Sequence, residues 1–297
     1  MEPIKRIHHI TAIVGDPNEN LKFYRDVLGL RLIKQTVNFD DPGVYHLYFA
    51  DHDATPGTVI TFFPWPNDNY GRKGSGQVGR IAFRVPKGSL SSWKEHLEDH
   101  GIETEVTRLF GSDSLEFDDV HGLELAIVEG SEASDVDKIL GFHGAVLLTG
   151  NPEGTKEFLT KKMGLKSLDV EGQNQHFETA GEERHHIITA IPPMTPGRFG
   201  ISTVHHIAWS VPDRETLESW QSALRGEGFG VTVVKDRNYF ESIYLGEPGN
   251  VVFEFATDGP GFTVDEDMES LGSALKLPEQ YEHRRPEYER SLPKLEL

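Results

Sequence analysis

The chain has 297 residues, no cysteine and a formal net charge of −19. Its length suits about two ordinary domains, and its negative charge disfavours nucleic acid and anionic membranes as partners. Disulfides, thiolate nucleophiles and cysteine metal sites are excluded, so a bound metal ion would have His, Asp or Glu ligands. The start "MEPIKRIHH" lacks the apolar core of a signal peptide, and no apolar run reaches the ~20 residues of a membrane helix. We therefore expect a cytoplasmic protein that binds a small molecule.

The first unit of the sequence, residues 7–64, predicts the element order β-α-β-β-β. "IHHITAIV" alternates and is rich in β-branched residues, which is typical of a strand. "DPNENLKFYRDVLGL" predicts one helix that Asp16 caps, that Pro17 fits at its first turn and that Gly29 ends. "RLIKQTVNF", "VYHLYFAD" and "GTVITFFP" predict three more strands.

Three later units repeat this order. The clearest copy has "TVHHIAWSV" as its first strand, "DRETLESWQSALRGEGF" as its helix, and "GVTVVKD", "FESIYLGE" and "NVVFEFAT" as its last strands. Two weaker copies lie between it and the first unit. Four copies about 60–70 residues apart predict an internally duplicated α+β fold made of four βαβββ modules.

The boundaries of these units predict two domains and a tail. The predicted segments are an N-terminal domain at 1–135 with modules 7–64 and 78–129, a C-terminal domain at 136–258 with modules 142–191 and 203–257, and an extension at 259–297. Polar segments with Gly or Pro at 130–141 and 192–202 are the expected linkers. The charged extension has the pattern of a short helix near "DEDMESLGSAL".

Adjacent histidines occur in the first strands of modules one and four, as His8–His9 and His205–His206. Because side chains alternate along a strand, only one member of each pair is expected to face the inside of a curved sheet. Glu254 lies in the apolar strand "NVVFEFAT", where a carboxylate is costly unless it is paired or bound to a metal. Two histidines and one carboxylate form the facial triad of non-haem Fe(II) enzymes. Histidines packed in the core and an ion pair of Glu254 with an arginine remain the structural alternatives.

The other candidate histidines have weaker support. His143 aligns with His206, but its module has no acid in its last strand, "HHIITAIP". We therefore expect His143, His185 and His186 not to bind a metal. His46, in "VYHLYFAD", either packs in the core or lines a pocket.

Longer segments resemble a known family: "HHIT", "FYRDVLGLRLIKQTVNFDDPGVYHLYFAD", "PGTVITFFPWP", "DRNYFESIYLGEPGNVVFEFAT" and "GFTVDEDMESLGSALKLP". They resemble the ring-cleaving dioxygenases that act on hydroquinones, in the vicinal oxygen chelate superfamily with glyoxalase I, bleomycin-resistance proteins and extradiol dioxygenases. The resemblance spans nearly the whole chain. It implies two pairs of curved mixed sheets and an Fe(II)-dependent, extradiol-type cleavage of hydroquinones or related dihydroxybenzenes by O2, in the degradation or detoxification of aromatic compounds.

The resemblance also implies roles for individual residues. It implies that His9, His206 and Glu254 bind Fe(II), for which the same ligand types allow Mn(II). The residues implied to act around the metal, by acid–base chemistry or in the pocket, are His8, Thr11, His205, Tyr244 and Arg237. If His9 and His206 share one metal, modules one and four must be adjacent, and modules two and three would pair without a metal.

The expected partners are a small aromatic substrate and O2, and a homo-oligomer is compatible with the sequence. Aromatic residues expected to wall the pocket, or else to belong to the core, are Phe62, Phe63, Trp209, Phe253 and Phe255. Two other functions share the fold, a glyoxalase-type metal-dependent isomerase or lyase and a non-catalytic small-molecule binding protein. The glyoxalase type generally takes acids from both partner modules, and "VITFFP" of module one supplies none.

Overall fold

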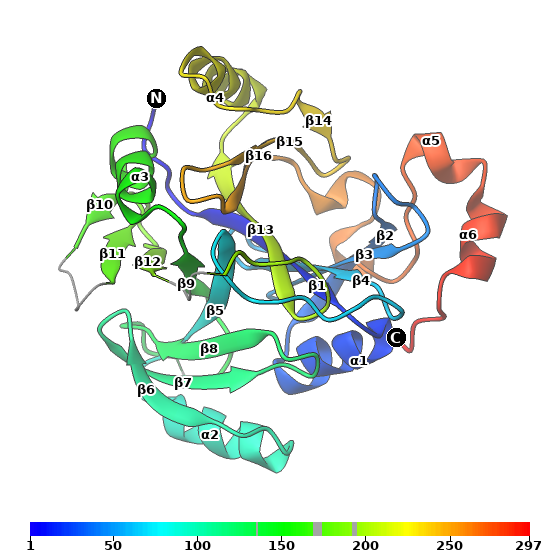
Figure 1. The fold of residues 1–297 in the computed structure, drawn as a ribbon. Helices are drawn as coiled ribbons and strands as arrows, with labels where there is room; N and C mark the ends of the chain where they lie inside the picture. The colour runs from blue at the N-terminus through cyan, green and yellow to red at the C-terminus, as the bar shows by residue number, and fades with distance from the viewer. Residues whose placement is uncertain (135, 169–173, 192–194) are drawn as a thin grey trace.

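The strands of the protein form two eight-stranded sheets, which the ribbon in Figure 1 shows. The computed structural model describes residues 1–134, 136–168, 174–191 and 195–297. Each sheet is mixed, because an antiparallel pair at its centre is flanked on both sides by strands in parallel. The predicted α+β fold with paired mixed sheets is confirmed.

The first sheet carries the strands of modules one and four. In the order in which they lie side by side, its strands are β14 Lys235–Asp236, β15 Phe240–Gly246, β16 Val252–Pro260, β13 Thr203–Val211, β1 Ile7–Val14, β4 Val59–Pro64, β3 Tyr45–Ala50 and β2 Arg31–Val37. In the second sheet the order is β10 Lys166–Ser167, β11 Gln175–Glu178, β12 His186–Ala190, β9 Gly141–Leu148, β5 Gln77–Val85, β8 Glu124–Glu129, β7 Ser112–Asp118 and β6 Glu105–Leu109.

The pairing of the modules follows the prediction. β1 pairs with β13, which joins the first and last modules, and β5 pairs with β9, which joins the middle two. Each sheet therefore takes strands from both sides of residue 135. The division of the chain into domains at 1–135 and 136–258 stays a prediction, and part of each predicted linker lies outside the described residues.

Every module has its helix after its first strand. These helices are α1 Pro17–Lys22, α2 Leu90–Asp99, α3 Pro152–Glu157 and α4 Arg214–Gly226. The predicted first helix begins as expected, because Asp16 accepts hydrogen bonds from the amides of Asn18 and Glu19. Its last part differs from the prediction: a π-helical turn at Phe23–Val27 follows α1. Gly29 then ends the segment at a φ of 67°, which favours glycine.

The predicted strand at 230–236 is mostly wrong, because only its last two residues pair as β14. Side chains of α4 hold the backbone before β14 instead. Arg225 donates to the carbonyls of Val231 and Thr232, and Gln221 also donates to Thr232. These side chains thus satisfy the two carbonyls, while the Thr232 amide donates to the carbonyl of Tyr244 on β15.

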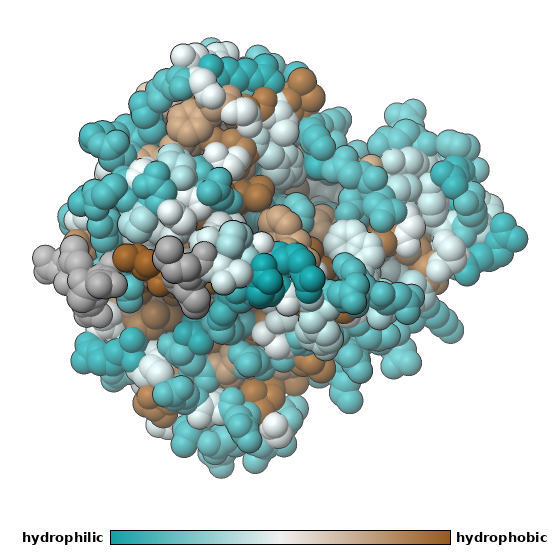
Figure 2. All heavy atoms as spheres, viewed as in Figure 1, coloured by the Kyte–Doolittle hydropathy of each residue, from teal (hydrophilic) through white to brown (hydrophobic). Residues whose placement is uncertain are grey.

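The C-terminal extension covers the β2 edge of the first sheet. The amide of Lys276 donates to the carbonyl of Gln35, and Tyr45 of β3 donates to the carbonyl of Pro293. A covered edge cannot pair with a second chain. The predicted helix near 265–275 is only a 3₁₀ turn, Met268–Ser270. Helices α5 Glu279–Glu282 and α6 Arg285–Ser291 follow it, in a lobe whose surface in Figure 2 is mostly hydrophilic.

No helix in the described part of the chain has both the length and the apolar character that crossing a membrane requires.

Candidate metal centre

Glu254 lies on β16 between two phenylalanines that point away from it. Phe255 stacks on Trp220 of α4, with 4.5 Å between ring centroids, and Phe253 contacts Trp209. Because side chains alternate along a strand, Glu254 faces the opposite side, toward the inside of the first sheet. Its side chain has no exposed surface (0 %). Phe253, Phe255 and Trp209 therefore belong to the core.

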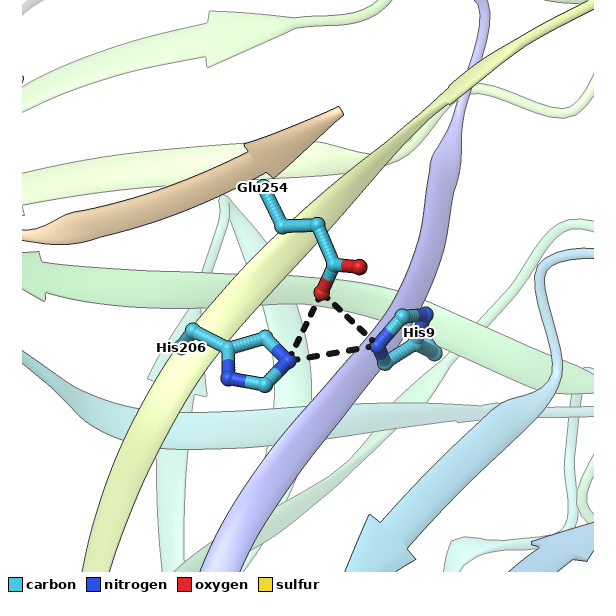
Figure 3. A group of neighbouring side chains, drawn as sticks. All are labelled: His9, His206 and Glu254. Carbon is cyan, nitrogen blue, oxygen red and sulfur yellow. Dashed lines mark hydrogen bonds and ion pairs between the residues drawn. The ribbon is translucent and has the colours of Figure 1, made fainter. Parts of the chain in front are cut away.

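Three side chains from three adjacent strands meet on this inner face, as Figure 3 shows. His9 comes from β1, His206 from β13 and Glu254 from β16. The Glu254 Oε2 atom lies 3.2 Å from His9 Nε2 and 2.8 Å from His206 Nε2, and the two Nε2 atoms are 3.3 Å apart. One donor atom from each residue lies within 4.8 Å of the others, which is close enough for all three to share one ion.

The charges of this group fit a divalent cation. Burial alone raises the pKa of Glu254, but His9 and His206 outweigh it and hold that pKa well below its usual range. Burial lowers the pKa of His206, which favours the neutral ring that a metal requires. Neither oxygen of Glu254 has a hydrogen-bond partner of good geometry among the described residues. A buried carboxylate facing two imidazole nitrogens is the donor set of a 2-His-1-carboxylate site.

Each pair of adjacent histidines sits at a β-bulge, which strict alternation did not predict. Between β1 and β13 the register shifts at His8 and again at His205, so each is an extra residue in its strand. A bulge re-aims the side chain of the extra residue. The Nδ1 atoms of His8 and His9 are 2.8 Å apart, and those of His205 and His206 are 2.7 Å apart. The first member of each pair thus contacts the ring of its neighbour rather than the opposite face of the sheet.

The contact between His8 and His9 determines which ring nitrogen of His9 is free to bind a metal ion. His8 Nε2 donates to the carbonyl of Thr257 at 3.1 Å, and burial lowers the pKa of His8 to about 3. A neutral ring with its proton on Nε2 accepts at Nδ1. His9 therefore donates from its own Nδ1 and keeps a free lone pair on Nε2, the atom beside Glu254. Such partners set the tautomer and orientation of a metal-binding histidine.

A cavity of about 160 Å³ opens onto His9 and His206, with Glu254 buried behind them. Its other lining residues are Asn38, Phe39, Asp40, His46, Tyr48, Phe63, Trp65, His205, Arg237, Phe240 and Tyr244. An engineered apolar cavity of about 150 Å³ is large enough to bind benzene, so this cavity suits a single aromatic ring. Of the aromatic residues expected to wall the pocket, Phe63 does so, and Phe62 does not line it.

The structure brings Tyr244 and Arg237 together on one wall of this cavity. Arg237 Nε donates to the Tyr244 hydroxyl oxygen at 3.3 Å, and its Nη2 atom donates to Asp40 at 3.0 Å. Burial raises the pKa of Tyr244, so its hydroxyl stays protonated. His205 also lines the cavity, whereas His8 and Thr11 lie behind its surface.

The opposite wall carries a hydrogen-bonded chain that the sequence reasoning missed. The Tyr48 hydroxyl lies 2.9 Å from His46 Nδ1, and His46 Nε2 lies 2.8 Å from the Thr61 hydroxyl. Thr61 in turn lies 2.7 Å from the hydroxyl of Thr11. His46 packs against Phe63 and also lines the cavity, so the two alternatives predicted for His46, core packing and pocket lining, are both observed. Its spacing of two residues from Tyr48 was the available signal, since residues i and i+2 share a face of a strand.

Thr61 occupies the place in module one that Glu254 has in module four. β1 and β13 are related by an approximate twofold exchange centred on the pair Ile10 and Ile207. Thr61 pairs with Thr11 of β1, and Glu254 pairs with Ala208 of β13, which is the counterpart of Thr11. A neutral hydroxyl thus replaces a second carboxylate at the metal centre.

The same positions in the second sheet carry no ligand set. Its register is centred on Ile81 and Ala145, which puts Arg80 and Gly144 at the places of the two ligand histidines. Ile188, paired with Val146, has the place of Glu254. Arg80 instead binds Glu116, with 2.5 Å between Nη1 and Oε2.

The alignment of His143 with His206 is wrong by one residue. The register shifts at His143, so His143 is the counterpart of His205 and Gly144 is the counterpart of His206. Within the described residues, His9, His206 and Glu254 form the only group of three side chains placed to hold a metal ion. That His143, His185 and His186 bind no metal stays a prediction.

Comparisons with known proteins agree with this architecture. The family model of the Glyoxalase/Bleomycin resistance protein/Dioxygenase superfamily matches residues 6–127 and 141–255. The chain is 47% identical to the "Putative ring-cleaving dioxygenase MhqO" of Bacillus subtilis, over 96% of this chain and 95% of that protein. It is 32% identical to the chlorohydroquinone/hydroquinone 1,2-dioxygenase of Sphingobium indicum, over 98% of this chain and 97% of that protein.

A solved structure agrees as well. The crystal structure of a "putative dioxygenase from Bacillus subtilis" superposes with a TM-score of 0.96 at 45% identity, covering 100% of this chain and 99% of that one. Both the sequence matches and the structural match extend over nearly the whole chain. The protein therefore belongs to the glyoxalase/bleomycin resistance protein/dioxygenase superfamily, as a relative of its ring-cleaving dioxygenases.

Proposed function

We propose that the protein is an Fe(II)-dependent dioxygenase that opens the ring of hydroquinones, or related dihydroxybenzenes, by an extradiol-type reaction with O2. The observation that carries this proposal is the buried group of two histidines and one carboxylate, whose two histidines line a cavity sized for one aromatic ring. The relatives named as ring-cleaving and hydroquinone dioxygenases support the reaction class.

In this proposal His9, His206 and Glu254 hold the metal ion. Bound Fe(II) supplies Lewis acidity toward a phenolic oxygen and the redox chemistry that dioxygen requires. Three protein ligands leave coordination positions for the substrate and for oxygen. Mn(II) fits the same donor types, so the metal content of the purified protein decides between them.

His205 then acts as a hydrogen-bond donor in the cavity. His206 needs a free lone pair on Nε2 to bind the metal, so it carries its proton on Nδ1 and donates to His205 Nδ1. A neutral His205 consequently presents an Nε2–H group, and burial, which lowers its pKa to about 3, keeps it neutral. This group donates a hydrogen bond to an oxygen atom of the substrate in the cavity.

Tyr244 binds and orients the reacting oxygen atoms. Arg237 already donates to its hydroxyl oxygen, which leaves the Tyr244 proton free for a substrate oxygen. Phe63 and Phe240 limit the access of water to the ring in the cavity. His8 and Thr11 act from behind the cavity surface, by holding His9 and Thr61 in place.

Oxygen uptake tests the proposal. The protein is reconstituted with Fe(II) without oxygen and then given hydroquinone, catechol or a thiol–methylglyoxal adduct in aerated buffer. We expect O2 consumption with hydroquinone together with loss of its aromatic absorbance, and no reaction of the adduct. No oxygen uptake with any dihydroxybenzene would contradict the function, and isomerisation of the adduct would favour a glyoxalase-type enzyme.

A further inference from the structure

The cavity has a tyrosine on each of its two walls. Tyr48 of β3 pairs with Thr61, and Tyr244 of β15 pairs with Glu254. Because Thr61 and Glu254 are counterparts in the twofold exchange, Tyr48 and Tyr244 are counterparts as well. Both line the cavity, and they belong to modules at opposite ends of the chain.

The two tyrosines have different partners. Tyr244 is bound by the guanidinium group of Arg237, a cation that favours an ionised oxygen nearby. Tyr48 is bound by the imidazole of His46, whose other nitrogen is taken by Thr61. One wall thus suits a phenolate or another charged oxygen, and the other wall suits a neutral hydroxyl.

Of the two members of its chain that line the cavity, Tyr48 is the one with hydrogen-bonding capacity left over. A phenol hydroxyl has one donor and two acceptor positions, and His46 uses one of them. Both nitrogens of His46 are already engaged. Asn38, another polar residue of the lining, accepts with its Oδ1 atom from the amides of Asp40 and Asp41.

We propose that Tyr48 binds the second hydroxyl of the aromatic substrate, the one that does not face the metal ligands, and that His46 positions Tyr48 for this contact. The inference rests on the proposed function and adds the residues that select a dihydroxybenzene over a simple phenol. A hydroxyl buried without a partner loses its hydrogen bonds to water, so a site that provides a partner discriminates against ligands without that hydroxyl.

Comparing the binding of two ligands isolates the effect of the contact between Tyr48 and the second hydroxyl. Hydroquinone and 4-methylphenol share the hydroxyl that faces the metal, and a methyl group replaces the second hydroxyl in 4-methylphenol. Binding of each is measured by calorimetry without oxygen, on the Fe(II)-loaded protein. For Tyr48→Phe we expect the Kd of hydroquinone to rise about tenfold and the Kd of 4-methylphenol to change by less than about twofold.

A control variant lies on the same strand. The hydroxyl of Tyr45 donates to the carbonyl of Pro293, and Tyr45 does not line the cavity. Tyr45→Phe should leave both Kd values unchanged. His46→Phe keeps an aromatic ring beside Phe63 and removes the partner of Tyr48, so it should weaken hydroquinone alone, by about threefold.

The possible outcomes separate this inference from the proposed function. If the wild-type protein consumes O2 with hydroquinone, but Tyr48→Phe weakens both ligands equally or neither, the inference is wrong and the function stands. If the wild-type protein binds neither ligand and consumes no O2, both are wrong. A loss confined to hydroquinone in both Tyr48→Phe and His46→Phe supports the inference.

Discussion

Glu254 is the residue on which the metal centre depends most. It is fully buried, it faces His9 and His206, and its strand neighbours point into the core. Sequence patterning could predict this residue, because a lone carboxylate in an apolar strand is costly without a cation. The two histidine ligands followed from the resemblance and from the adjacent pairs, since alternation alone left the choice within each pair open.

Replacing Glu254 by glutamine tests its role. Glu254→Gln keeps the size of the side chain but removes the charge, so we expect Fe(II) affinity to fall by about a hundredfold or more. Metal content after dialysis measures this loss. Glu241→Gln on neighbouring β15 is the control, because Glu241 binds Arg214 outside the cavity and should keep its iron. Normal iron content in Glu254→Gln would remove Glu254 from the ligand set.

A substitution of Thr61 tests whether this residue faces the coordination positions that the three ligands leave open. Thr61→Glu places a carboxylate at the counterpart of Glu254, where it can occupy a coordination position that substrate or oxygen needs. We expect the variant to retain its metal while its O2 uptake with hydroquinone falls by about a hundredfold. Thr61→Val, which adds no ligand, should lose much less activity. Equal activity of Thr61→Glu and the wild type would show that Thr61 does not face the open side of the metal.

At the scale of the elements, the two β-bulges explain why the histidines occur in pairs. Alternation predicted that one member of each pair faces away from the metal centre, and the register shifts instead turn His8 and His205 toward their neighbours. A one-residue shift in register depends on how two distant strands pair, which the sequence of either strand alone does not determine. The chain of Tyr48, His46 and Thr61 was missed because it depends on the pairing of β3 with β4, which places Tyr48 opposite Thr61.

The contact that the bulge creates between His8 and His9 leads to a prediction for the affinity of the protein for Fe(II). His8→Ala removes the group that accepts from His9 Nδ1 and leaves the metal ligands in place. We expect Fe(II) to bind about ten- to a hundredfold more weakly, as for other outer partners of metal-binding histidines. Competition with a chelator measures the affinity. His52→Ala, at an exposed turn, is the control. Unchanged affinity in His8→Ala would show that His8 does not orient His9.

At the scale of the whole molecule, the fold joins the two ends of the chain at one site. The repeat of β-α-β-β-β units could be predicted from periodicity, and sharing of one metal predicted that the first and last modules pair. The backbone at 230–234 and the helices at 279–291 could not be predicted. Side chains of α4 hold the first segment, and contacts of Lys276 with β2 and of Pro293 with β3 hold the chain on either side of the helices.

Buried histidines make the stability of the metal-free protein depend on pH. Burial lowers the pKa of His8 and of His185 to about 3, against about 6.5 in an unfolded chain. Between pH 6.5 and 3 the unfolded state therefore binds more protons, and the free energy of unfolding falls as the pH decreases. Each histidine contributes up to about 1.4 kcal/mol per pH unit.

Urea unfolding from pH 7 to pH 5 measures this slope. We expect His185→Gln to be less stable than the wild type at pH 7, because the amide of Ile7 loses its acceptor, and to show a shallower slope. His52→Gln should keep the wild-type slope. A free energy of unfolding that does not change between pH 6.5 and pH 5 would contradict the assignment of neutral, buried histidines.

The central claim is that the two ends of the chain hold one metal ion through His9, His206 and Glu254. Anomalous diffraction at the iron edge, from crystals of the Fe(II)-loaded protein grown without oxygen, tests it most directly. The account predicts one strong peak per chain, bounded by His9 Nε2, His206 Nε2 and the carboxylate of Glu254. No peak between these three side chains, or a peak at His143 and His186 in the second sheet, would contradict it.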